Sequence, residues 1–175
     1  MECECLAIIQ ARVTSRRLPG KMLVEISGRP LLWHVVDRAR SSQRIQDIVV
    51  ATTDSAADDP LVDLCREIDV KCFRGNEEDV LDRFYNAALT HRPTIVVRLT
   101  GDCPMIDPGV IDEIVDARQT NGVDYASNLG TLDAEGHFLG RTFPDGLDAE
   151  AFTFETLERT WREAELPSER EHLSS

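Results

Sequence analysis

The chain of 175 residues lacks the features that mark secreted, membrane-spanning and zinc-binding proteins. No apolar run approaches the roughly 20 residues of a membrane span, and the opening MECECLAIIQAR has acids where a signal peptide carries its basic region. The five cysteines include no CxxC pair and the four histidines are scattered, so we expect neither a zinc site nor a disulfide framework. These absences predict a cytoplasmic protein with no membrane partner.

Positive charge is also scarce, with 19 Lys and Arg against 32 Asp and Glu and a formal net charge of -13. Such a chain repels polyanions, so we expect no nucleic-acid partner. The shortage makes one exception informative. Residues 11–21, here called the basic loop, contain no carboxylate but four cations: Arg12, Arg16, Arg17 and Lys21.

Short apolar runs alternate with amphipathic segments along the chain. Strand-type runs occupy residues 5–10, 47–52, 70–73 and 94–99, and another begins at 124; helical patterns occupy 30–39, 60–68, 76–89, 108–115 and 154–161. This alternation predicts an α/β fold with a mainly parallel sheet and flanking helices, in a single domain of residues 1–175. We expect Asp59, Asp107 and Thr153 to cap helices, and the polar residues 130–140 to form a loop or hairpin tip.

The basic loop directly follows the first predicted strand. Ligands of open parallel sheets bind beyond the carboxyl ends of the strands, and arginine suits phosphate oxygens. We therefore expect Arg12, Arg17 and Lys21 to converge on an anionic ligand. A solvated loop with incidental charges is the alternative, and the spacing matches neither GxxxxGK[ST] nor GxGxxG.

Two carboxylates are candidate ligands for a divalent cation. Asp102 follows the fourth strand, on the same predicted edge as the basic loop, and Mg²⁺ prefers one or two carboxylates together with phosphate oxygens. Its alternative role is to cap a turn. Strand alternation puts Asp148 and Glu150 on one face, and Asp148 is the expected second ligand. The alternative is that both carboxylates belong to the exposed polar face of an edge strand and bind no metal.

Other polar residues near the expected ligand edge carry weaker signals. Thr53 and Asp54 end the second strand and are expected to face the ribose or base. Asn128 is a candidate sugar contact. Arg83 could reach the nucleotide or pair with a neighbouring acid, and we favour the ion pair. We expect Trp161 to pack in the core.

The segment Ala11-Arg12-x-x-Ser15-x-Arg17-Leu18-Pro19-Gly20-Lys21 resembles the signature loop of the sugar cytidylyltransferases, the family that includes CMP-KDO synthetase and acylneuraminate cytidylyltransferase. The nearest resemblance is to the branch of the spore coat polysaccharide biosynthesis protein F (SpsF). It continues in order through VVATTD, FRGNEEDVLDRF, VVRLTGDCPMIDP, DYASN, RTFPDGLDAEAF and PSEREH. The chain departs at Thr14 and Arg16, where the family usually has glycine and a smaller polar residue.

This resemblance implies a Rossmann-like nucleotidyltransferase fold and a Mg²⁺-dependent transfer of CMP from CTP to an acidic or modified sugar, with release of pyrophosphate, in surface polysaccharide biosynthesis. It implies catalytic roles for Arg12, Lys21 and Asp102, with Asp102 and Asp148 as metal ligands. The expected substrate-binding residues are Ala11, Ser15, Arg17, Thr53, Asp54, Gly101 and Asn128.

Two other functions remain open at this point: a glycosyltransferase of similar fold that consumes a nucleotide sugar, and a non-catalytic nucleotide-binding domain. The family continues beyond PSEREH, so we expect a chain truncated at its C-terminus, with reduced activity. Related enzymes are often dimers, which leaves a homodimer open.

Overall fold

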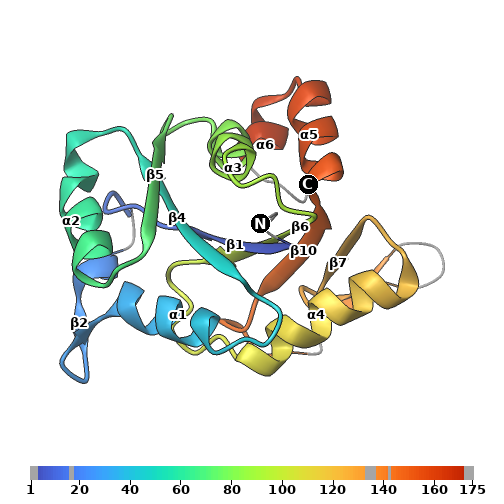
Figure 1. The fold of residues 1–175 in the computed structure, drawn as a ribbon, viewed down its shortest axis with the longest axis horizontal. Helices are drawn as coiled ribbons and strands as arrows, with labels where there is room; N and C mark the ends of the chain where they lie inside the picture. Colours follow the sequence, from blue (N-terminus) through green and yellow to red (C-terminus); the bar gives the residue numbers. More distant parts are fainter. Residues whose placement is uncertain (1–3, 16–17, 133–136, 142, 172–175) are drawn as a thin grey trace.

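A six-stranded sheet forms the centre of the molecule (Figure 1). The computed structural model describes residues 4–15, 18–132, 137–141 and 143–171. In spatial order the strands are β5 (Lys71–Gly75), β4 (Asp47–Thr53), β1 (Cys5–Gln10), β6 (Ile95–Thr100), β10 (Ala149–Thr153) and β7 (Tyr125–Ser127). The first four pair in parallel, whereas β10 runs antiparallel to both of its neighbours. The order of the parallel strands is that of a Rossmann-like half, which confirms the predicted fold class.

Helices cover both faces of this sheet. One core contains buried side chains of α1 (Leu31–Arg40), α2 (Asp59–Glu67) and α4 (Pro108–Asn121) against one face of β1 and β6. The other core contains α3 (Val80–Leu89) and α5 (Phe154–Glu163) against the opposite face. Strand β1 is buried along almost its whole length, as a parallel strand covered on both faces should be.

The remaining elements are short. The 3₁₀ turns η1 (Lys21–Leu23) and η2 (Ala56–Asp58) follow the basic loop and β4, and β2 (Glu25–Ile26) pairs with β3 (Arg29–Pro30). Strands β8 (Thr131–Leu132) and β9 (Phe138–Gly140) pair antiparallel, which confirms the predicted hairpin. Within the described ranges, every helix is too short or too polar to cross a lipid bilayer.

The helix starts test three sequence predictions. The side chain of Asp107 accepts a hydrogen bond from Gly109 N at the start of α4, and that of Thr153 accepts one from Thr156 N at the start of α5, as predicted. The prediction for Asp59 is wrong, because Asp59 is already the first residue of α2. The N-cap position belongs to Asp58, and its carboxylate does not cap the helix.

The last helix, α6 (Pro167–Glu171), packs beside α3 and α5 (Figure 1). Trp161 stacks on Tyr85 with ring centroids 4.2 Å apart, and its indole N–H donates to Asp82 Oδ1 at 2.9 Å. Arg170 Nε donates to Asp79 Oδ2 at 2.7 Å, at the N-cap of α3. The predicted packing of Trp161 is confirmed, and it fixes the chain after β10 onto α3.

Strand β1 and the turn after β6 approach each other closely at Gly101. Its N–H donates to Gln10 O at 2.8 Å. A Cβ atom at this position would lie 2.9 Å from the same carbonyl oxygen, 3.1 Å from Ala11 Cβ and 3.2 Å from Met22 Sδ. Glycine is therefore needed here to bring the basic loop and the turn after β6 together.

We predict that Gly101→Ala destabilises the protein by about 1–3 kcal/mol, because backbone and packed side chains must shift to admit the methyl group. Urea unfolding measures this loss. The matched control is Gly109→Ala, where a Cβ would meet only the Asp107 side chain and alanine favours the helix. Equal losses of stability in the two variants would contradict the tight approach.

Candidate active site

A cleft with a volume of about 1010 Å³ lies at the carboxyl ends of β1 and β6. Its walls come from the basic loop, the segment before α3, the end of β6 and α6. The described residues that line it are Gln10, Ala11, Arg12, Thr14, Ser15, Lys21, Met22, Glu77, Glu78, Val80, Arg83, Arg98, Thr100, Asp102, Pro167 and Glu171. The cleft thus brings together five of the predicted site residues: Ala11, Arg12, Ser15, Lys21 and Asp102.

Lys21 and Asp102 form an ion pair inside this cleft. Lys21 begins η1 and Asp102 follows β6, so the pair joins two segments that are 81 residues apart. Burial favours the neutral carboxyl, but the hydrogen bond and the charge of Lys21 outweigh it and hold the pKa of Asp102 below its ordinary value. Asp102 is therefore an ionised carboxylate beside a cation, at the edge where the sequence places both.

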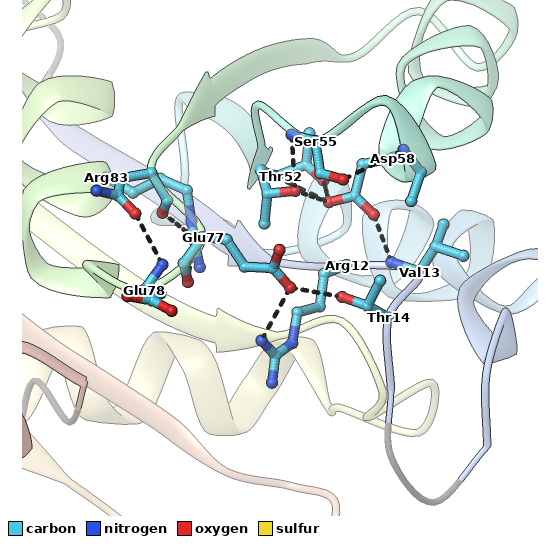
Figure 2. Close-up of polar contacts among 12 residues, drawn as sticks. Arg12, Val13, Thr14, Thr52, Ser55, Asp58, Glu77, Glu78 and Arg83 are labelled. Carbon is cyan, nitrogen blue, oxygen red and sulfur yellow. Dashed lines mark hydrogen bonds and ion pairs between the residues drawn. The ribbon is translucent and has the colours of Figure 1, made fainter.

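Arg12 and Thr14 reach across the cleft to Glu77, as Figure 2 shows. The Arg12 guanidinium lies 3.6 Å from Glu77 Oε1, and the Thr14 hydroxyl donates to the same oxygen at 2.9 Å. All three side chains reach solvent, so a competing anion has access to Arg12. Sequence reasoning missed Glu77, although Thr14 marked the position where this chain departs from its family.

The other cations of the cleft are also held by the protein. Arg83 is fully buried and donates to the carbonyl oxygen of Asn76 at 2.6 Å, so it supports the segment that carries Glu77 rather than forming the predicted ion pair with an acid. Burial lowers its pKa, and the nearby charge of Arg12 lowers it further. Arg98 pairs with the buried Glu150, which also accepts a hydrogen bond from the Tyr125 hydroxyl at 3.0 Å.

A buried carboxylate lies behind the start of the basic loop. Asp58, which is 0 % exposed, accepts hydrogen bonds from Val13 N at 2.7 Å, from the Thr52 hydroxyl at 2.9 Å and from Thr53 N at 3.0 Å (Figure 2). The hydroxyl of Thr53 donates to it as well. Sequence reasoning missed Asp58 because the Asp-Asp-Pro pattern is typical of a helix cap.

Four predicted substrate-binding residues are not among the described residues that line the cleft: Thr53, Asp54, Asn128 and Gly101, whose backbone is packed against the end of β1. Thr53 is fully buried against Asp58, so its side chain lies behind the cleft wall. Asp54 is exposed, and its N–H donates to Gly75 O at 2.9 Å. Asn128 is buried and joins β7 to the start of β10, donating to Leu147 O at 2.7 Å and accepting from Ala149 N at 2.9 Å.

The predicted second metal ligand, Asp148, is held by another partner. Its carboxylate accepts a hydrogen bond from Arg141. Asp148 also precedes β10, so the strand alternation assumed from the sequence does not extend to this residue. Burial raises its pKa above the ordinary value, although Arg141 opposes the shift. Among the described residues, no three His, Cys, Asp or Glu side chains cluster as a metal site. Of the two predicted metal ligands, Asp102 is the one that lines the cleft.

Comparison with known proteins places this architecture in a family. The cytidylyltransferase family profile matches residues 6–172. The chain belongs to the cytidylyltransferase family. The Leptospira borgpetersenii cytidylyltransferase superposes with a TM-score of 0.85 and 33% identity, covering 99% of this chain and 69% of that one. A CMP-KDO synthetase complexed with CTP, at 21% identity and a TM-score of 0.74, shares the fold over 96% of this chain and 82% of its own.

Three curated relatives that match this chain are all longer than it is. An uncharacterized protein of Methanocaldococcus jannaschii is 38% identical over 97% of this chain and 65% of its own length. The spore coat polysaccharide biosynthesis protein SpsF of Bacillus subtilis is 41% identical over 70% of this chain and 52% of its own length. The 3-deoxy-manno-octulosonate cytidylyltransferase of Nitratidesulfovibrio vulgaris strain Hildenborough is 37% identical over 63% of this chain and 44% of its own length. The chain therefore spans between about two fifths and two thirds of the length of these relatives.

We predict that Glu77→Gln raises the affinity for inorganic tripolyphosphate about two- to fivefold. The substitution removes the carboxylate that pairs with Arg12 but keeps an oxygen that accepts from Thr14. The free energy that an exposed ion pair contributes corresponds to a change in affinity of this size. Isothermal titration calorimetry at fixed ionic strength measures the change. Glu78→Gln is the matched control, because it removes the same charge from the next residue; an equal gain there would assign the effect to net charge instead of the Arg12 contact.

Proposed function

We propose that this protein transfers CMP from CTP to a hydroxyl group of a sugar and releases pyrophosphate. Membership of the cytidylyltransferase family supports the reaction class. The observation that carries the proposal is the placement of Lys21 and Arg12 in one cleft with the ionised Asp102, at the carboxyl edge of the sheet. A nucleoside triphosphate needs these groups together: cations for the phosphate oxygens and a hard carboxylate for a divalent ion.

The cations of the basic loop hold the β- and γ-phosphates in this proposal. Arg12 and Lys21 line the cleft together with Ser15, whose hydroxyl is a further hydrogen-bond donor for phosphate oxygens. Arg17, the remaining predicted contact, lies outside the described residues. When the sugar oxygen bonds to the α-phosphorus and the bond to the bridging oxygen breaks, negative charge grows on the departing pyrophosphate, and these cations stabilise it there.

Asp102 fits the role of a ligand for Mg²⁺. It is ionised, it reaches the cleft, and Mg²⁺ characteristically takes one or two carboxylates together with substrate phosphate oxygens. When bound, the metal ion would neutralise charge on the phosphates of the nucleotide. Asp148 stays the proposed second ligand, and it would first have to exchange its Arg141 partner for the ion.

The acceptor is proposed to be an acidic or modified sugar, activated for surface polysaccharide synthesis in the cytoplasm. The names of the Bacillus subtilis and Nitratidesulfovibrio vulgaris relatives support this substrate class. These relatives are longer than this chain, so the activity of the whole protein, the identity of its sugar and a homodimeric assembly are also proposals.

We predict that CTP with Mg²⁺ raises the melting temperature more than CMP does, because only CTP presents β- and γ-phosphates to Arg12 and Lys21. A ligand at a hundred times its Kd adds about 2.7 kcal/mol of stability, which corresponds to roughly 5–10 °C for a domain of this size. Differential scanning fluorimetry at equal nucleotide concentrations makes the comparison. Equal shifts from the two nucleotides would contradict the triphosphate role of the basic loop.

We predict that Asp102→Asn lowers pyrophosphate release from CTP at least about a hundredfold, while CTP affinity falls less than about tenfold because Arg12 and Lys21 remain. The assay supplies Mg²⁺ and a panel of acidic and neutral sugars.

The second ligand is tested in the same assay with a matched pair of variants. Asp148→Asn and Asp145→Asn each remove a carboxylate that pairs with Arg141. Only Asp148→Asn should lower turnover. Near wild-type turnover of Asp102→Asn would show that Asp102 is not a metal ligand. Equal turnover of Asp148→Asn and Asp145→Asn would show that Asp148 is not one.

A further inference from the structure

Asp58 occupies an unusual place for a carboxylate at the start of a helix. It stands at the N-cap position of α2, where an aspartate ordinarily accepts a hydrogen bond from its own helix, yet its side chain makes no such cap. Instead, Oδ1 accepts from Val13 N, which is 45 residues away in the sequence. The side chain therefore serves the basic loop rather than the helix that carries it.

This carboxylate is kept ionised by its donors. Burial would raise its pKa, but hydrogen bonds from Thr53, Val13 and Thr52 outweigh burial and lower the pKa below the ordinary value. Burying a charge is costly unless it is fully hydrogen-bonded, and the four donors described for Asp58 provide that compensation. Hydrogen bonds to a charged acceptor are stronger than those between neutral groups, so the bond that Val13 N–H donates to Asp58 is strong.

Val13 is the residue at which the basic loop closes. Its carbonyl oxygen accepts hydrogen bonds from Ser15 N at 2.8 Å and from Gly20 N at 2.9 Å. The two ends of the loop are thus tied to one peptide carbonyl, and the N–H of the same residue is tied to Asp58. On either side of Val13, Arg12 and Thr14 point into the cleft (Figure 2).

We propose that Asp58 is a positioning residue for the triphosphate: it fixes Val13 and thereby sets where the basic loop presents its cations. This inference rests on the proposed function of the loop. Asp58 is fully buried and is not among the described residues that line the cleft, so in this proposal it makes no contact with the substrate. Its effect on binding passes through Val13 and is confined to the part of the nucleotide that the loop holds.

Asparagine, the neutral isostere of aspartate, cannot replace the carboxylate of Asp58. Two backbone N–H groups, of Val13 and Thr53, point at different oxygens of Asp58. Asparagine offers one acceptor oxygen and one amide group that only donates, so one of the two N–H groups must lose its partner. The hydroxyls of Thr52 and Thr53 can rotate to accept from the new amide, whereas a backbone N–H cannot, and Asp58→Asn should therefore release either the loop or the end of β4.

The test compares the affinities of Asp58→Asn and of the wild type for CTP, CMP and inorganic tripolyphosphate, each with Mg²⁺, by calorimetry on the folded proteins. We expect CTP and tripolyphosphate to bind about ten- to a hundredfold more weakly to the variant, and CMP to change less than about threefold. The matched control is Asp59→Asn, which removes the adjacent, exposed carboxylate that pairs with Arg74, and it should leave all three affinities within twofold.

A measurement on the wild type keeps the inference testable if Asp58→Asn fails to fold. The amide proton of Val13, followed by nuclear magnetic resonance, should exchange with solvent at least about a hundredfold more slowly than an open-loop amide. Rapid exchange of this amide in the wild type overturns the inference. A folded Asp58→Asn variant also overturns it if its Val13 amide exchanges rapidly while its CTP affinity is unchanged, or if it weakens CTP and CMP equally. If the wild type binds neither CTP nor tripolyphosphate, the proposed function itself fails, which is a separate result.

Discussion

The parallel pairing of β1 with β4 on one side and β6 on the other is the constraint on which the rest of the structure depends. Because parallel strands end at the same edge, three segments that are far apart in the sequence meet there: the basic loop, the turn that holds Asp58, and the turn that holds Asp102. Gly101 then lets the turn after β6 make backbone contact with the end of β1, directly before the basic loop. The cleft is thus a product of sheet topology before any ligand is considered.

Within that cleft the charges are arranged in pairs. Lys21 forms an ion pair with Asp102, Arg12 with Glu77, and Arg98 with Glu150. A chain with a net charge of -13 can keep cations together because nearby carboxylates compensate them. The pairs differ in accessibility: Glu150 is buried, whereas Glu77 and Asp102 reach solvent. An incoming phosphate can therefore take the place of Glu77 on Arg12, and a metal ion can take the place of Lys21 on Asp102, at a modest cost in free energy.

The sequence predicts the strands, most helix starts and the meeting of Lys21 with Asp102, because hydrophobic periodicity and strand direction determine them. It fails where a side chain's direction depends on contacts distant in sequence. The Asp-Asp-Pro pattern indicates a helix cap at Asp59, whereas Asp58 accepts a hydrogen bond from Val13 N. Thr53 follows the pattern of a ligand contact, but its hydroxyl donates to Asp58. For Asp148, only the strand-alternation argument fails, because alternation assigns faces inside a strand and β10 begins one residue later.

Helix α6 contributes Pro167 and Glu171 to the cleft wall, yet it is held to α3 largely through Arg170. Docking of this helix and occupation of the cleft are therefore linked equilibria: a ligand that touches α6 strengthens its docking by the same factor by which docking strengthens ligand binding. The stacked pair of Trp161 and Tyr85 lies in the adjoining interface between α5 and α3. Because Arg170 of α6 also donates to the carbonyl oxygen of Trp161 at 3.2 Å, we expect the indole fluorescence of Trp161 to change when α6 leaves α3.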